Sequence, residues 1–187
     1  MRFALLFRGI NVGGKNAVAM AELRQTLADA GFTRVTTYLQ SGNALVSTPE
    51  TQTSVVAARV QSAFLERFGF SAGVVVLSQA ELQRAVEGIP FTPAELAAAE
   101  AADPAVDHLY LYFLPDAPET AALERLTADA ANGDRVFAAE RTVYLMCEQS
   151  IRKSKAAARI ARLFPAATAR NGKTARQVYA LLRETEF

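Results

Sequence analysis

The chain has 187 residues, of which 51% are apolar, and its formal net charge is only +1. These values exclude a wholly disordered chain and argue against a general nucleic-acid binder, because nucleic-acid-binding domains are usually strongly basic. The single cysteine excludes an intramolecular disulfide, so a reducing cytoplasm is the expected location. No apolar run approaches the length of a membrane span, so no membrane partner is expected.

The first half of the chain alternates between strand patterns and amphipathic helix patterns. Continuous apolar or β-branched runs predict strands, and apolar residues at three- and four-residue steps predict helices. In chain order, the patterns predict a strand at 3–7, a helix at 20–30, strands at 34–39 and 44–47, a helix at 51–68, a strand at 73–77 and a short helix after the capping box at 78–81. The order β-α-β-β-α-β is that of a ferredoxin-like, split βαβ unit, which makes the fold class α+β.

The second half repeats this order in part. It predicts a capped helix from 92, a strand at 108–114, a helix at 118–130, a hairpin of strands at 135–138 and 142–147, and helices at 151–164 and 173–184. We therefore expect two similar subdomains, residues 1–90 and residues 91–187.

The segment GINVGGKN, residues 9–16, directly follows the first predicted strand. It has the Gly-x-x-x-x-Gly-Lys spacing of a P-loop, but Asn16 stands where a P-loop has Ser or Thr to bind Mg²⁺. The next helix is expected to begin only at Met20, and a P-loop needs parallel strands rather than the hairpin predicted at 34–47. We therefore do not predict a P-loop NTPase, and the sequence identifies no cofactor.

A looser kind of anion site remains open. In a split βαβ unit, the loop after the first strand and the turn between the second and third strands lie at the same end of the sheet. This places two cations, several amides, one hydroxyl and two glycines together: Arg8, Asn11, Gly13, Gly14, Lys15, Asn16, Gln40, Ser41 and Asn43. Such a set could bind a small anionic or phosphorylated ligand. The alternative is that the asparagines only satisfy backbone groups of the loops.

The stretch LLFRGINVGGKNAVAMAELRQTLADAGFTRVTTYLQSGNALV, residues 5–46, closely resembles the opening of a bacterial family known as domain of unknown function 1697. The motifs RGINVGGKN and YLQSGN carry the resemblance, which thins through the middle and returns near TARNGKT. Family members usually have a Trp where this chain has Gly172. The resemblance implies two α+β subdomains similar to ferredoxin-like units, and it implies no activity.

A second anion candidate lies just before the last predicted helix, in TARNGKT. Asn171 is a good N-cap, and cations around a helix N-terminus attract anions. Residues 151–187 carry a net charge of +7, against −9 for residues 81–150. The candidate consists of Arg170, Asn171, Lys173 and Thr174. An ordinary capped helix on a basic surface is the favoured alternative.

Catalytic and metal-binding patterns are not recognisable. His108 is the only histidine, and no nucleophilic residue lies at a spacing known from catalytic motifs. Cys147 is expected to be a buried core thiol. Without a Cys/His cluster, no metal site is predicted. Whether the chain is an enzyme, and its oligomeric state, stay open.

Two other classes of function remain as alternatives. Aromatic residues on the strands could stack single-stranded nucleic acid: Phe3, Phe7, Tyr38, Tyr110 and Tyr112. The Ala-rich helix at 94–102 could instead pack against a protein partner.

Overall fold

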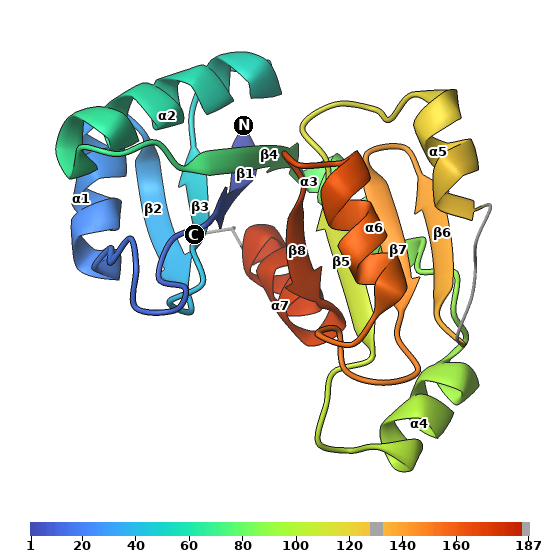
Figure 1. The fold of residues 1–187 in the computed structure, drawn as a ribbon. Helices are drawn as coiled ribbons and strands as arrows, with labels where there is room; N and C mark the ends of the chain where they lie inside the picture. Colours follow the sequence, from blue (N-terminus) through green and yellow to red (C-terminus); the bar gives the residue numbers. More distant parts are fainter. Residues whose placement is uncertain (128–132, 185–187) are drawn as a thin grey trace. The chain divides into compact units, whose positions relative to one another are not determined.

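The computed structural model describes residues 1–127 and 133–184 (Figure 1). The chain divides into two compact units, Met1–Arg84 with Gln177–Phe187, and Ala85–Arg176. The boundaries fall within two helices, α3 (Gln79–Glu87) and α7 (Gly172–Arg183). The α+β class is confirmed, with two four-stranded antiparallel sheets. The division at residue 90 stays a prediction; the contact units differ from it in grouping the end of the chain with its beginning.

The first unit has the predicted βαββαβ order, with its strands arranged as β2-β3-β1-β4 and every neighbouring pair antiparallel. The central strand is buried because Phe3, Leu5 and Phe7 lie in one core with α1 and α2. Gly69, with φ of +73°, ends α2 in the left-handed conformation that glycine adopts without strain. The elements are β1 (Arg2–Arg8), α1 (Met20–Asp29), β2 (Thr33–Tyr38), β3 (Asn43–Ser47), α2 (Thr53–Phe68) and β4 (Gly73–Ser78).

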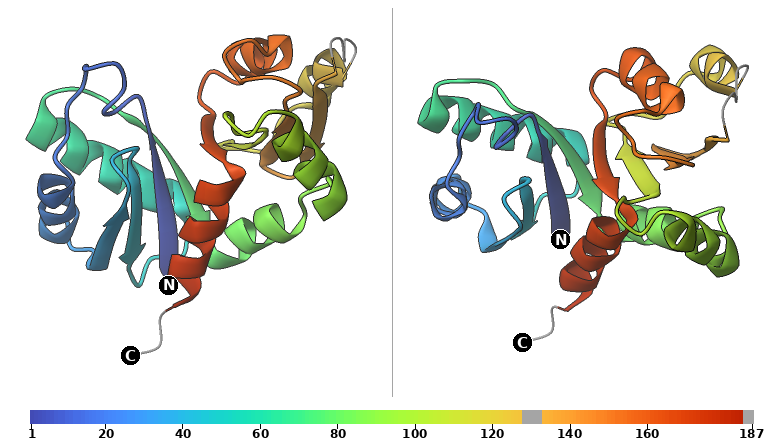
Figure 2. Two further views of the ribbon diagram at one scale, coloured as in Figure 1. Left: turned by 90° about the horizontal axis from the view of Figure 1, so that it is seen from below. Right: turned by 60° about the horizontal axis from the view of Figure 1, so that its bottom comes forward.

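The second unit repeats the same topology, with strands in the order β6-β7-β5-β8. Its strand β8 (Thr168–Asn171) was not predicted and runs directly into α7, as Figure 2 shows. The helix predicted from residue 151 begins at Lys155, because Ser154 accepts a hydrogen bond from the N–H of Ala157 and so caps it. The other elements are α4 (Pro93–Ala102), β5 (Leu109–Phe113), α5 (Thr120–Thr127), β6 (Arg135–Ala139), β7 (Thr142–Met146) and α6 (Lys155–Leu163). The predicted helix end at 128–130 lies outside the described residues.

Corresponding corners of the two units can be identified from the sheet register. In the first unit, the N–H of Phe7 donates to the carbonyl of Gly42 just beyond the last β1–β3 pair, at 2.8 Å. In the second, the N–H of Leu114 donates to the carbonyl of Arg141 just beyond the last β5–β7 pair, also at 2.8 Å. Each corner thus lies where the first strand of a unit leaves its sheet, beside the turn of the hairpin.

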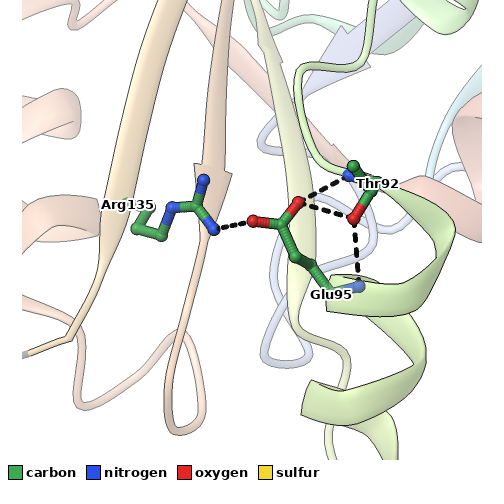
Figure 3. A network of polar contacts seen from close by, with 3 residues as sticks. All are labelled: Thr92, Glu95 and Arg135. Carbon is green, nitrogen blue, oxygen red and sulfur yellow. Dashed lines mark hydrogen bonds and ion pairs between the residues drawn. The ribbon is translucent and has the colours of Figure 1, made fainter.

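Helix α4 begins in a complete capping box that also reaches β6 (Figure 3). The Glu95 carboxylate accepts hydrogen bonds from the Thr92 N–H and hydroxyl, at 2.7 and 2.8 Å. Its other oxygen pairs with the Arg135 guanidinium, and that hydrogen bond, together with those from Thr92, lowers the pKa of Glu95 to about 2. None of the helices in the described ranges is long and apolar enough to cross a lipid bilayer.

Candidate functional site

The glycine pair of the β1–α1 loop forms a tight hairpin turn. The N–H of Lys15 donates to the carbonyl of Val12, at 3.1 Å. Gly13 and Gly14 lie between them with φ of +59° and +74°, signs that match a type I′ turn. The turn itself therefore favours glycine at both positions. The Lys15 amide is used inside the turn, and the surrounding strands are antiparallel, so the loop differs from a P-loop in both respects.

The side chain of Asn11 ties this loop to the β2–β3 turn. Its Nδ2 donates to the carbonyls of Val18 and Gln40, each at 2.9 Å, and its Oδ1 accepts from the Val18 N–H at 2.7 Å. Asn16 donates to the Gly9 carbonyl at 2.8 Å. The loop and the turn thus meet as the topology predicted, and both asparagine amides bond to loop backbone.

The β2–β3 turn is braced in a similar way. Asn43 is buried, and its Nδ2 donates to the Tyr38 carbonyl at 2.9 Å and to the Ser41 hydroxyl at 3.1 Å. Gly42 has φ of +78°, and a Cβ there would lie 2.6 Å from Cδ1 of Ile10. Of the predicted site residues, Asn11, Asn16 and Asn43 therefore hold the scaffold.

Two cations extend from this scaffold. The side chains of Arg8 and Lys15 are exposed, and within the described ranges neither makes a hydrogen bond or an ion pair. Residues 8–18 and 38–43 contain no Asp or Glu. Gln40 and Ser41 are exposed beside them. We call this surface, formed by residues 8–16 and 39–43, the basic corner.

Sequence reasoning missed two apolar side chains at the basic corner. Val12 is 67% exposed and Leu39 is 52% exposed, which is unusual for residues of this type. Leu39 also has φ of +59°, a conformation that is strained for a bulky residue. The apolar character of both residues was visible in the sequence, but their exposure depends on the loop conformation.

The second anion candidate, at the start of α7, is largely occupied by its own neighbours. Asn171 caps the helix by accepting from the Thr174 N–H at 2.8 Å, and its Nδ2 donates to Asp107 at 2.8 Å. Lys173 pairs with Glu100 at 3.1 Å. An anion bound here would have to approach both carboxylates. The arrangement agrees with the alternative of an ordinary capped helix.

The remaining titratable candidates are buried in the second unit. Arg170 is 8% exposed and donates to the hydroxyl of Thr168 at 2.8 Å, and burial lowers its pKa to about 10. His108 has both ring nitrogens within 3.0 Å of backbone carbonyls, those of Asp103 and Cys147. Burial raises the pKa of the Cys147 thiol to about 12, which suppresses the thiolate. The described part of the chain has no group of three or more His, Cys, Asp or Glu residues placed to hold a metal ion.

The strand aromatics proposed for base stacking are mostly in the cores. Phe3 and Phe7 are 0% and 1% exposed and pack with α1 and α2. Tyr112 is 7% exposed, and Tyr110 packs against the same core as Tyr112. These four side chains therefore do not form an open stacking platform. Tyr38 is half-buried on β2.

Fold and site together define an α+β protein of two ferredoxin-like units with a cationic loop corner in the first. A family model described as "Protein of unknown function (DUF1697)" matches residues 1–144, and the chain belongs to that family. The predicted resemblance is thereby confirmed, although the matched residues end before TARNGKT.

A solved structure shares this fold. It is described as a conserved bacterial protein from Streptococcus pneumoniae, and the match has a TM-score of 0.71 at 22% sequence identity. The alignment covers 97% of this chain and 98% of the other. At this identity the likeness shows the fold alone. No curated protein matches the sequence.

Proposed function

We propose that the first unit binds a small anionic or phosphorylated ligand at the basic corner. The observation that carries the proposal is that Arg8 and Lys15 are exposed on a braced loop that has no acidic residue to neutralise them. An anion would be the natural counter-charge for such a pair.

The residues of the basic corner have distinct roles in this proposal. Arg8 and Lys15 supply the charge, and Gln40 and Ser41 supply polar groups at the adjacent turn. The turn at Gly13 and Gly14 leaves room for a ligand, because a Cβ at either position would meet no atom within 4 Å. Asn11, Asn16 and Asn43 act indirectly by holding the loops together. Residues 8–18 and 38–43 contain no His, Cys, Asp or Glu, so we propose binding and assign no reaction.

The expected affinity is modest. Two charge-assisted contacts worth about 1.5–3 kcal/mol each correspond to dissociation constants from roughly millimolar to tens of micromolar. A ligand at about a hundred times its dissociation constant would stabilise the protein by roughly 2.7 kcal/mol. That corresponds to a rise of roughly 5–10 °C in the unfolding midpoint of a chain of this size.

A thermal-shift panel tests the proposal with inorganic phosphate, nucleotides with and without Mg²⁺, sugar phosphates and a short oligonucleotide. The rise should be lost in Arg8→Gln and in Lys15→Gln. It should be retained in Lys153→Gln, which removes an exposed lysine from the second unit. An equal rise in all three variants would overturn the proposed location. A rise with the oligonucleotide alone would favour the nucleic-acid alternative over a small ligand.

A further inference from the structure

The second unit contains a cavity of about 320 Å³ beside the end of β5, the strand that corresponds to β1 of the first. One wall comes from the β5–α5 connection with Ala122 and Arg125 of α5, and the other from the end of α6 and the connection to β8. This volume lies at the lower end of the range of roughly 300–1,000 Å³ typical of small-molecule sites. We call this cavity, formed by residues 114–125 and 163–167, the second corner.

The floor and walls of the second corner are apolar. Leu114 is 3% exposed and Ala167 is 8% exposed, while Leu163 and Phe164 are half-buried beside them. Three of the lining residues are prolines, which have no backbone N–H to donate. The lining therefore favours an apolar group and offers few donors to an anion.

Two carboxylates at the second corner have no side-chain partner among the described residues. Asp116 and Glu119 line it, are exposed, and make no side-chain hydrogen bond or ion pair with any described residue. Arg125 also lines the cavity, and its Nε donates to the Ala121 carbonyl of its own helix at 3.1 Å. Arg141 lies next to the lining, where its Nε donates to the Leu114 carbonyl at 3.0 Å. Both guanidiniums thus bond to backbone carbonyls, whereas the two carboxylates remain available to a ligand. The C-terminal end of α6, which carries partial negative charge, lies at the same corner.

We propose that the second corner binds a small organic cation with an apolar body, such as a protonated amine attached to a ring or a short hydrocarbon. The apolar body lies on Leu114, Leu163 and Phe164. The ammonium group faces Asp116 and Glu119. This site is separate from the basic corner, and its ligand has the opposite charge.

A purely structural role for the two carboxylates is the competing explanation. Acidic residues before a helix favour its N-terminus, and α5 begins at Thr120. That role would make no distinction between a cationic and an anionic ligand of the same shape. The charge preference of the cavity, rather than its occupancy alone, therefore decides between the two explanations.

The test is a titration of the full chain followed by two-dimensional NMR, with three probes of similar size. The probes are 2-phenylethylammonium, neutral 2-phenylethanol and anionic 3-phenylpropionate. We expect the ammonium probe to shift the resonances of Leu114, Ala122 and Leu163 at roughly millimolar concentration. We expect it to bind at least about fivefold more tightly than the other two probes.

Two variants and a control make the result specific. Asp116→Asn with Glu119→Gln should abolish the preference for the cation and leave weak binding of the neutral probe. Ala122→Phe should fill the cavity and reduce the binding of all three probes. Glu66→Gln with Glu148→Gln makes the same change in net charge at exposed carboxylates outside the cavity and should change nothing.

The opposite results would overturn the proposal. Equal binding of the three probes, or tighter binding of 3-phenylpropionate, would show that the carboxylates do not select the ligand. The same follows if the Asp116→Asn, Glu119→Gln double variant keeps the preference. Shifts confined to residues outside the second corner would show that the cavity is not the binding site.

Discussion

The side chain of Asn11 joins the two loops of the basic corner, and its removal should destabilise the first unit. It makes three hydrogen bonds of 2.7–2.9 Å, to Val18 and Gln40. At roughly 0.5–1.5 kcal/mol each, their loss in Asn11→Gly should cost about 2–4 kcal/mol of unfolding free energy. Glycine is the informative replacement because it tolerates the φ of +54° found at this position.

Asn16 provides a matched control for the same substitution. Its φ is +53°, so Asn16→Gly makes the same backbone change, but its side chain donates only one exposed hydrogen bond, to Gly9. We expect Asn16→Gly to cost about 1 kcal/mol or less. A third variant, Asn11→Asp, keeps the acceptor for the Val18 N–H but places a carboxylate against two carbonyls. It should therefore be at least as destabilising as Asn11→Gly.

The assay is urea unfolding followed by circular dichroism, with amide NMR signals used to identify which unit unfolds. The midpoint attributed to the first unit should fall in Asn11→Gly and change little in Asn16→Gly. Equal losses in the two variants would contradict this prediction, because they would show that the three Asn11 bonds contribute no more than the single Asn16 bond.

Four further predictions concern single sites. Gly42→Ala should cost more than about 2 kcal/mol, because a Cβ there would approach a side-chain carbon to 2.6 Å at a positive φ, and urea unfolding measures the loss. Leu39→Gly should leave stability unchanged or raise it by up to about 1 kcal/mol in the same assay, since it relieves a strained φ at an exposed position. Glu95 should titrate by NMR with a pKa of about 2. Because this pKa is lowered from 4.5, the stabilising contribution of the carboxylate is complete above pH 4.5 and is lost as the pH falls through about 2. In Arg135→Met the pKa of Glu95 should rise toward 4.5. Cys147 should resist thiol reagents at pH 8 in the folded protein and react once urea unfolds it, as thiol-modification kinetics would measure.

The fold could largely be predicted because local signals agreed with the topology. Gly69 marks the end of α2 because glycine adopts the left-handed conformation found there without strain. Thr92 and Glu95 mark the start of α4 because their side chains accept hydrogen bonds from backbone N–H groups at the helix N-terminus. Strand β8 could not be predicted, because Thr168–Asn171 is short and polar and is a strand only through its pairing with β5. The apolar pattern alone extends α6 back to residue 151, whereas the Ser154 hydroxyl caps the helix and fixes its start at Lys155.

The candidate site could be predicted less well. Topology was enough to bring residues 9–16 beside the β2–β3 turn, and the Asn11–Gln40 bond shows that contact. The type I′ turn at Gly13 and Gly14 was not foreseen, because the same glycine spacing suits a phosphate loop and a hairpin turn. No sequence motif marks the cavity of the second corner. Its walls come from segments about 40 residues apart, which only the packing of α5 and α6 brings together.

The most direct test of the proposed anion site is an NMR titration of the full chain with pyrophosphate. We expect the amide signals of Gly13, Gly14 and Lys15 and those of the β2–β3 turn to shift together and to approach saturation by roughly 50 mM. The shifts should be lost in the Arg8→Gln, Lys15→Gln double variant and kept in Lys153→Gln. Saturating shifts that persist in the double variant, or no shift at the basic corner at that concentration, would contradict the proposed site.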